Sequence, residues 1–264
     1  MNKDIFLKDY LASRIIIDGK DVNGYGLVYY KNNEKIIDDL LSIDFENKDV
    51  LSVLSSSDQL LMFRALESKK VDTFDFNRLT IYYYYLRKWS IKYMNKLYPL
   101  VDDNNWLKEL ISKVKTNDDL EKKAINFFKL HLKEDSNLLH LFYDIDIQRE
   151  GETLFNNASM AKKYVNTDLV FYNYDLFRKI NNTINNKYDY IYISNILEWA
   201  RGDIKKIENA KKNLDKLLKN RGTIICTKLI NRNKSNILSE RQIFDSNYDF
   251  KEFFDKKVYT YTQK

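Results

Sequence analysis

Two groups of polar side chains early in the sequence have types and spacing that could bind a ligand. Ser55, Ser56, Ser57 and Asp58 come directly after the apolar run 49–54, and Asp75 ends the next such run. Backbone amides and hydroxyls in such a turn, at the start of a helix, can hold a polar or anionic group. An acidic side chain about twenty residues beyond the first group can accept hydrogen bonds from both hydroxyls of a ribose. We therefore expect a ligand with a nucleoside part.

The absence of glycine from this turn narrows the class of ligand. The backbone must approach the pyrophosphate of a dinucleotide closely, and glycines permit this approach. Residues 55–58 contain no glycine. S-adenosylmethionine has no pyrophosphate and presents an amino acid carboxylate and ammonium, which serine hydroxyls and Asp58 suit better. The structural alternative is that Asp75 caps the helix that begins near Arg78, and that the serines form an ordinary turn.

A further polar group follows the apolar run 188–193. Ser194, Asn195 and Glu198 would face the same cleft as the first two groups. Trp199 could form a wall for a flat ring or a sulfonium. The plainer alternatives are that Trp199 belongs to the core and that Asn195 caps the next helix.

Strands that alternate with helices would position these groups. Short apolar runs predict strands at 49–54, 71–75, 168–172, 188–194 and 222–227. Apolar residues at three- and four-residue spacing predict helices at 59–67, 78–97 and 204–218. Asp203 would cap the last of these helices.

This alternation indicates an α/β, Rossmann-like fold with a mostly parallel sheet and helices on both faces. Residues 257–261 alternate like a final edge strand. No proline-rich or glycine-rich linker divides the chain. We therefore expect a single domain over residues 1–264, with 102–150 as an inserted helical cap.

Composition argues against several other functions. The chain has 264 residues, and 44 Lys and Arg against 38 Asp and Glu give a net charge of +6, which is modest for a nucleic-acid binder. One cysteine excludes an internal disulfide, and two histidines are too few for an ordinary zinc site. No signal peptide or bilayer-spanning run is apparent. We expect a cytoplasmic protein with no metal and no nucleic-acid partner.

Three other features fit a structural role better than a functional one. The tyrosines at 82–85 could stack bases, but on a helix two would pack on the sheet and two would face outward or toward the cleft. His131 and His140 fall on opposite sides of a helix and form no pair of ligands, although His140 remains a candidate base. Cys226 lies in an apolar strand and is expected to be buried.

Residues 49–61 (DVLSVLSSSDQLL), followed by 70–77 (KVDTFDFN), resemble the cofactor-binding opening of the betaine-lipid synthase A-like family. Further matches lie at 33–36, 83–91, 173–174 and 188–196, so the resemblance spans roughly residues 27–230, with a weak match in the helical middle. Members of that family are described as S-adenosylmethionine-dependent 3-amino-3-carboxypropyl transferases with the class I methyltransferase fold. This chain departs from the family pattern at Ser57, where members usually have glycine, and a serine there could narrow the pocket or resist a positive φ angle.

The resemblance implies which residues contact the ligands. It assigns the amino acid end of S-adenosylmethionine to residues 55–58, the ribose to Asp75 and Asn77, and the acceptor-side cleft to the region of Ser194 and Asn195. The predicted cofactor contacts are Ser55, Ser56, Ser57, Asp58, Gln59, Asp75, Asn77, Asp175, Ser194 and Asn195. The predicted contacts on the acceptor side are Glu34, Tyr174, Glu198 and Trp199.

The resemblance favours transfer of a 3-amino-3-carboxypropyl group from the sulfonium to a small-molecule or lipid-headgroup acceptor. The reaction would be an in-line displacement that requires no metal and no covalent nucleophile. Two alternatives stay open. A methyltransferase would hold the same cofactor with the same turn and acid, and a non-catalytic binding protein or partner subunit would carry a degenerate site.

Overall fold

The computed structural model describes residues 28–32, 37–133, 138–142, 153–178, 184–200, 203–230, 238–240, 243–244 and 259–262. The chain divides into two compact units, which are described separately. The helical unit comprises Met1–Asn32, Ser55–Leu61 and Phe76–Asp168, and the sheet unit comprises Asn33–Leu54, Met62–Asp75 and Leu169–Lys264. The chain therefore passes several times from one unit to the other.

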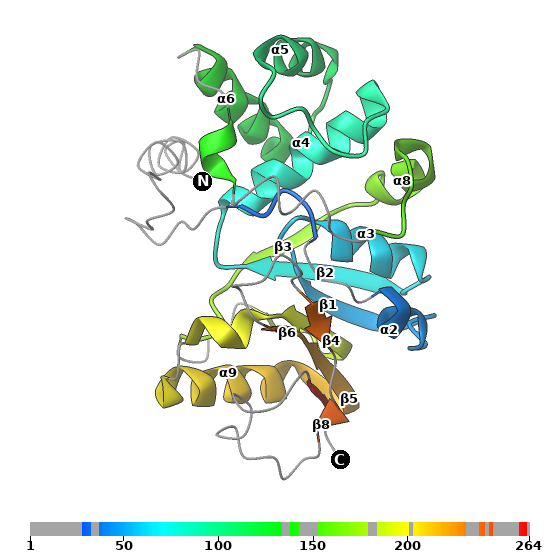
Figure 1. The fold of residues 1–264 in the computed structure, drawn as a ribbon, viewed down its shortest axis with the longest axis vertical. Coiled ribbons are helices and arrows are strands. Elements are labelled where there is room, and N and C mark those ends of the chain that lie inside the picture. The colour runs from blue at the N-terminus through cyan, green and yellow to red at the C-terminus, as the bar shows by residue number, and fades with distance from the viewer. Residues whose placement is uncertain are drawn as a thin grey trace. The chain divides into compact units, whose positions relative to one another are not determined.

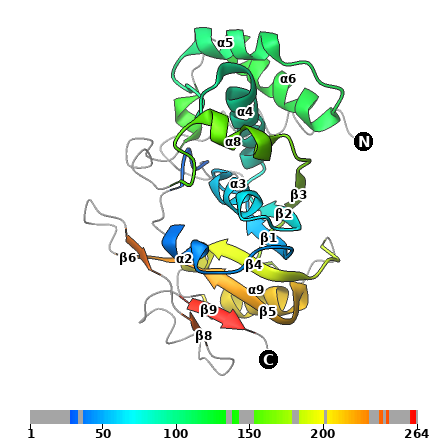
Figure 2. The same cartoon turned by 90° about the vertical axis from the view of Figure 1, so that its right-hand side faces the viewer.

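The sheet unit is built on five parallel strands in the order β3-β2-β1-β4-β5 (Figure 1). Their bounds are β1 Asp49–Val53, β2 Lys70–Asp75, β3 Val170–Asn173, β4 Tyr188–Ser194 and β5 Leu218–Cys226. An antiparallel strand, β9 (Tyr259–Thr262), continues the sheet beside β5. Strand β8 (Ile243–Phe244) pairs with β9 and is the last strand on that side of the sheet (Figure 2). The predicted α/β, Rossmann-like fold with a mostly parallel sheet is confirmed.

The central strands are buried beneath other elements, and their apolar sequences suit this position. Residues 50–53 of β1 are all buried, as a strand covered on both faces requires. On β4, Tyr190 and Tyr192 lie two residues apart and therefore share one face. Their rings meet those of Phe45 and Phe63 at centroid distances of 4.8 and 5.6 Å. Phe45 follows α2 (Ile37–Leu41) and Phe63 belongs to α3 (Asp58–Ala65), so these segments cover that face.

Helix α9 (Ile204–Leu217) flanks the sheet beside β5. The carboxylate of Asp203 accepts the backbone N–H groups of Lys205 and Lys206, which satisfies donors that a helix start leaves without partners. The apolar stripe of the helix is buried at Ile207, Ala210, Leu214 and Leu217. The predicted cap and stripe are both confirmed.

The helical unit is organised around α4 (Leu79–Met94), which contacts α5 (Asn104–Lys113), α6 (Asp119–Lys133) and α8 (Ala158–Val165). Helix α4 ends before the predicted residue 97 because Asn95 adopts a left-handed conformation with φ 52°. All four tyrosines at 82–85 are buried, and Tyr82 stacks on Phe127 of α6 with ring centroids 4.5 Å apart. The prediction that two of them face outward or toward a cleft was wrong, because helix α6 and the rings of Tyr30 and Phe142 also pack against them.

Other elements differ from the predictions in position or extent. The final strand is not at the edge of the sheet, because β9 pairs with β5 on one side and with β8 on the other. Helices α4 and α8 belong to the same unit as residues 102–150. The hairpin of β6 (Lys228–Ile230) and β7 (Leu238–Glu240) was not predicted. Within the described residues, no helix is both long and apolar enough to cross a membrane.

Candidate functional site

The carboxyl ends of the parallel strands bring several predicted polar residues to one edge of the sheet unit. Asp75 ends β2 and Ser194 ends β4, and these two strands pair with β1 on either side. Tyr174 and Asp175 come directly after β3, which pairs with β2. The order of the strands reverses between β1 and β4, and open α/β sheets bind ligands at such a switch point. This edge is therefore the candidate site of the sheet unit.

Asp75 is held in place through its backbone. Its carbonyl oxygen accepts the N–H of Tyr174 at 3.0 Å and the side-chain amide of Asn173 at 3.0 Å. The residue is only 6% exposed. A ligand hydroxyl that reached the carboxylate would therefore form its hydrogen bond away from bulk water, where such bonds are stronger.

Tyr174 and Asp175 shape the segment after β3. The ring of Tyr174 is buried and packs edge-on against Phe74, with centroids 6.1 Å apart. Burial, reinforced by the charge of Asp175, raises the pKa of Tyr174 to about 12, so the phenol is a hydrogen-bond donor at neutral pH. The carboxylate of Asp175 accepts the N–H of Phe177 at 3.0 Å and pairs with Arg178 at 3.2 Å, which stabilises the turn.

Ser194 has a left-handed backbone, with φ 51°, at the end of β4. Its carbonyl oxygen accepts the N–H of Thr227 at 2.9 Å, and its hydroxyl donates to Oδ1 of Asn195 at 3.3 Å. Asn195 is buried, and Trp199 is half-buried in the short helix η2 (Ile196–Ala200). Left-handed residues other than glycine concentrate at ligand sites, which favours this edge as a binding site.

The serine turn, residues 55–58, belongs to the helical unit and contains two left-handed residues. The φ angles of Ser55 and Ser57 are 44° and 66°. Ser57 therefore adopts the conformation that glycine would favour, at a cost of about 1–2 kcal/mol. Ser56, Ser57 and Asp58 are 0% exposed and Gln59 is 2% exposed, so their side chains lie in the interior.

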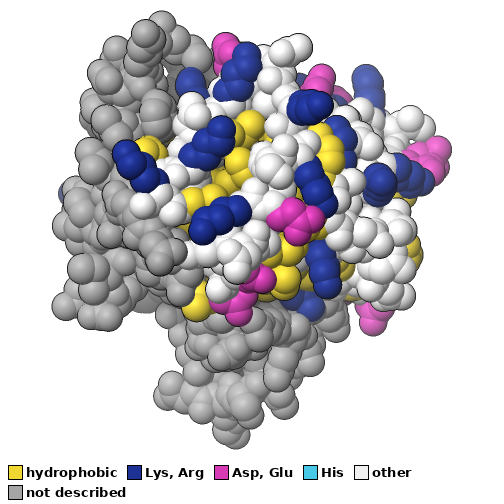
Figure 3. Space-filling model, turned by 90° about the horizontal axis from the view of Figure 1, so that it is seen from above, with side chains coloured by type: hydrophobic (Ala, Val, Ile, Leu, Met, Phe, Trp, Pro, Cys, Tyr) yellow, Lys and Arg dark blue, Asp and Glu magenta, His cyan; other side chains and the backbone are white. Residues whose placement is uncertain are grey.

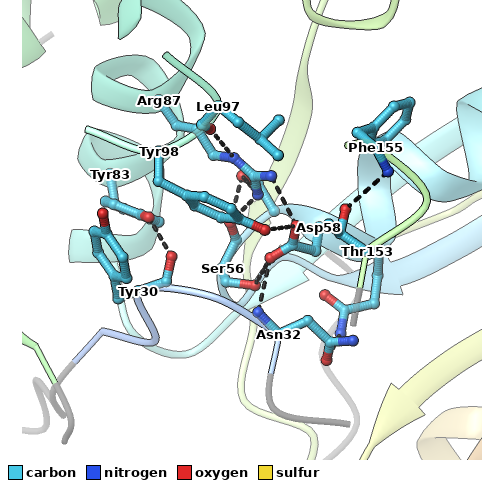
Figure 4. A network of polar contacts seen from close by, with 12 residues as sticks. Tyr30, Asn32, Ser56, Asp58, Tyr83, Arg87, Leu97, Tyr98, Thr153 and Phe155 are labelled. Carbon is cyan, nitrogen blue, oxygen red and sulfur yellow. Dashed lines mark hydrogen bonds and ion pairs between the residues drawn. The ribbon is translucent and has the colours of Figure 1, made fainter. Parts of the chain in front are cut away.

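The carboxylate of Asp58 is the centre of a buried polar network (Figure 4). Its Oδ1 accepts hydrogen bonds from Arg87 Nη2 at 2.7 Å and from the hydroxyl of Tyr98 at 2.8 Å. Its Oδ2 accepts from the hydroxyl of Ser56 at 2.8 Å and from the backbone N–H of Asn32 at 2.7 Å. A carboxylate has about four acceptor positions, so the protein itself uses the hydrogen-bonding capacity of Asp58. This favours a structural role for that side chain.

Arg87 connects α4 to the backbone of the serine turn. Its Nη1 donates to the carbonyl oxygen of Ser56 at 2.9 Å and to the hydroxyl of Ser57 at 3.3 Å. Its Nε donates to the carbonyl oxygen of Leu97 at 3.2 Å (Figure 4). The guanidinium therefore holds both the charge and the main chain of the turn.

The same network fixes the protonation of its members. Burial, reinforced by the charge of Asp58, raises the pKa of the Tyr98 phenol. Burial also raises the pKa of Tyr83, against the opposing charge of Arg87. For Arg87, burial lowers the pKa but the Asp58 carboxylate raises it, and the net effect is an increase. The phenols therefore remain donors and the guanidinium remains charged.

The sequence reasoning missed four members of this network: Tyr30, Asn32, Arg87 and Tyr98. Tyr30 accepts the hydroxyl proton of Tyr83 at its carbonyl oxygen, and Asn32 accepts Gln59 Nε2 at 2.9 Å. Arg87 alone carried a signal, because it is a charged residue within the apolar part of α4. Its partner could not be inferred from that position.

At the start of α4, Asn77 acts as a cap. Its Oδ1 accepts the N–H of Leu79 at 3.0 Å, and its carbonyl oxygen accepts the hydroxyl of Thr80 at 2.7 Å. Asn77 is 2% exposed. The contact between Asn77 and a ribose stays a prediction.

The remaining candidates divide into those the structure describes and those it does not. Glu34 and the side chains of Glu198 and His140 lie outside the described residues. His131 is buried on α6 with its ring 4.8 Å from that of Phe127, and Cys226 is buried as predicted. Across the described part of the chain, no group of three or more His, Cys, Asp and Glu residues could hold a metal ion.

The structure thus divides the predicted cofactor contacts between the units. The sheet unit contains Asp75, Asp175, Ser194 and Asn195, and the helical unit contains Ser55, Ser56, Ser57, Asp58, Gln59 and Asn77. A comparison of the sequence with protein-family models finds no match, and a comparison with curated proteins finds none either.

Proposed function

We propose that this chain is a transferase that uses S-adenosylmethionine and moves its 3-amino-3-carboxypropyl group to a small-molecule or lipid-headgroup acceptor. The observation that carries the proposal is the edge of the sheet unit, where Asp75 on β2 and Ser194 on β4 border the switch point beside β1. An acidic residue at the end of the second strand suits the hydroxyls of a ribose. The resemblance of residues 49–61 and 70–77 favours S-adenosylmethionine as the ligand.

The residues at this edge suit the binding and alignment that such a reaction needs. The sulfonium supplies the electrophilic carbon, so the chain's own task is to bind and orient. Asp75 would accept hydrogen bonds from both ribose hydroxyls. Ser194 and Asn195 offer hydroxyl and amide groups beyond β1, and the ring of Trp199 offers a face to a cation.

The reaction balances without a further reactant. A lone pair of the acceptor would form a bond to the γ carbon of the cofactor's side chain, and the bond from that carbon to sulfur would break. The products would be the neutral thioether methylthioadenosine, the alkylated acceptor and a proton. Tyr174 stays protonated at neutral pH, so it would act as a hydrogen-bond donor and not as the base.

The serine turn has its own proposed role. The resemblance assigns it to the cofactor's amino acid group, but Asp58 already accepts four hydrogen bonds from the protein. The contact with the cofactor's amino acid group therefore stays a prediction of the resemblance, and within the helical unit Arg87 holds the backbone of the turn in place.

Calorimetry with S-adenosylmethionine, followed by analysis of the nucleoside product, tests the function. The proposal predicts binding, and methylthioadenosine as the product once an acceptor is added from a fractionated small-molecule or lipid extract. S-adenosylhomocysteine as the product would instead identify a methyltransferase. If millimolar ligand produces no heat and no thermal shift, the protein does not bind this cofactor.

A further inference from the structure

The two units differ in charge. Among the described residues, the helical unit has 15 Lys and Arg residues against 8 Asp and Glu residues, whereas the sheet unit has 14 against 15. A general enrichment of lysine in the chain would make both units more positive. The surplus in the helical unit is therefore a local feature, and it would attract an anionic partner.

Much of this charge lies on the outer sides of helices. We use the name basic surface for the exposed lysines at the end of α4, on and after α5, and on α8: Lys92, Lys96, Lys108, Lys113, Lys115, Lys162 and Lys163. Helix α5 shows the pattern well, because Trp106 and Leu110 face the interior while Lys108 and Lys113 face outward. Figure 3 is seen from above the view of Figure 1, and Lys and Arg side chains are spread widely over that face, with fewer Asp and Glu side chains among them.

Large apolar side chains are exposed in the same unit. Leu100, Leu120 and Met160 are 36%, 40% and 47% exposed, and Met160 shares α8 with Lys162. Figure 3 shows hydrophobic side chains between the basic ones. Proteins that lie on a membrane combine these two features, because cations attract anionic headgroups while apolar side chains enter the interface.

A nucleic acid fits this surface less well. The exposed cations of the basic surface are lysines, whereas Arg87 is buried in the network around Asp58. Arginine, whose guanidinium is planar, is the side chain that binds a phosphate with two parallel hydrogen bonds. The tyrosines at 82–85 could have stacked bases, but all four are buried. An anionic bilayer requires neither feature.

We propose that the helical unit docks on anionic lipid bilayers through the basic surface. The lysines supply the attraction, and exposed apolar side chains such as Met160, which shares α8 with Lys162, supply shallow apolar contact. This inference goes beyond the proposed function, since it holds whatever ligand the sheet unit binds.

Sedimentation of the full chain with lipid vesicles tests the proposal. Vesicles of phosphatidylcholine that contain phosphatidylglycerol should bind the protein, pure phosphatidylcholine should bind it weakly, and raising the salt from about 0.1 to about 0.5 M should release it. The first variant replaces Lys92, Lys108, Lys115 and Lys162 with Gln, and we expect it to bind the anionic vesicles at least about tenfold more weakly. The matched control makes the same charge change in the sheet unit, at the exposed residues Lys187, Lys205, Lys206 and Lys212.

The control should bind within about twofold of the parent protein, because a docking surface depends on where charges lie and not only on their sum. Equal losses in the two variants would overturn the proposal, as would equal binding of the parent protein to anionic and neutral vesicles. Single-stranded DNA is added in a parallel assay. Binding to DNA that depends on the same four lysines, without binding to vesicles, would also overturn it. Matching unfolding midpoints show that all three proteins are folded.

Discussion

Arg87 and Asp58 form an ion pair across 2.7 Å, and their side chains are 1% and 0% exposed. They come from different elements, since Arg87 lies within α4 and Asp58 begins α3. A buried charge that loses its partner is costly, so each side chain stabilises the fold mainly by neutralising the other. Because Arg87 also donates to Ser56, the pair fixes the main chain of the serine turn as well.

Removing only one partner of this pair leaves the other charge buried and unpaired, and should therefore destabilise the protein strongly. We expect Arg87→Met to lower the free energy of unfolding by about 3–5 kcal/mol, since it leaves the Asp58 carboxylate buried without its cation. In the double variant with Asp58→Asn, the loss should be at least about 1 kcal/mol smaller than the sum of the two single losses. Urea unfolding of the four proteins measures this coupling, and strictly additive losses would contradict it.

The left-handed conformation of Ser57 predicts an unusual order of substitutions. Ser57→Ala and Ser57→Gly both remove the hydroxyl that Arg87 contacts, but only glycine relieves the backbone strain at φ 66°. We expect the glycine variant to be more stable than the alanine variant by about 1 kcal/mol, the reverse of the order in an ordinary helix. Thermal unfolding of the two variants gives the comparison. An alanine variant as stable as the glycine variant would show that the turn is not strained.

The regular parts of the fold could be predicted because their signals are local. Strand β4 has its predicted bounds, since Tyr recurs at every second position from 188 to 192 and Ile stands at 191 and 193. The end of α4 could not be predicted, because it depends on the left-handed conformation of a single residue, Asn95. The burial of the tyrosines at 82–85 depends on segments that are distant in the chain: Tyr82 stacks on Phe127 of α6, and Tyr83 packs against Tyr30 and Phe142.

The candidate site shows the same division. Asp75 and Ser194 could be assigned to one sheet edge, because parallel strands end on the same side. The pairing of Arg87 with Asp58 could not, since the two residues are 29 positions apart in different helices. The sequence prediction therefore treated Asp58 as a ligand group, whereas the structure gives its carboxylate four partners within the protein.

Asn77 provides a test that separates a helix cap from a ligand contact. Asn77→Ala removes the acceptor for the N–H of Leu79 and should lower the free energy of unfolding by about 1 kcal/mol. Asn77→Asp keeps an acceptor at that place and should be close to the parent protein in stability. Calorimetry with S-adenosylmethionine then completes the test. A loss of affinity in the aspartate variant, at unchanged stability, would indicate a direct ligand contact in addition to the cap.

The raised pKa of Tyr174 predicts a loss of stability in alkali. The folded value is about 12 and the ordinary value is 10.0, so the stabilisation is complete below pH 10 and is lost as the pH rises toward 12. The loss should reach about 2 kcal/mol. The difference in unfolding free energy between the parent protein and Tyr174→Phe, measured at pH 9 and pH 11.5, isolates this residue because the other tyrosines titrate in both proteins. A difference that does not change with pH would contradict the prediction.

Asp75 should matter for binding of the cofactor's ribose. We expect Asp75→Ala to weaken S-adenosylmethionine binding by about 1–3 kcal/mol, since the ribose hydroxyls would lose their acceptor. Asp49→Asn is the matched control. Asp49 is the first residue of β1, so it lies at the amino ends of the strands, away from the candidate site at their carboxyl ends, and its replacement should leave the affinity unchanged. A 2′-deoxy analogue of the ligand makes the test specific: it should bind the parent protein more weakly, while Asp75→Ala should discriminate much less between the two ligands. If the variant instead loses the same amount of affinity for both, Asp75 acts on some other part of the ligand, and the ribose assignment is wrong.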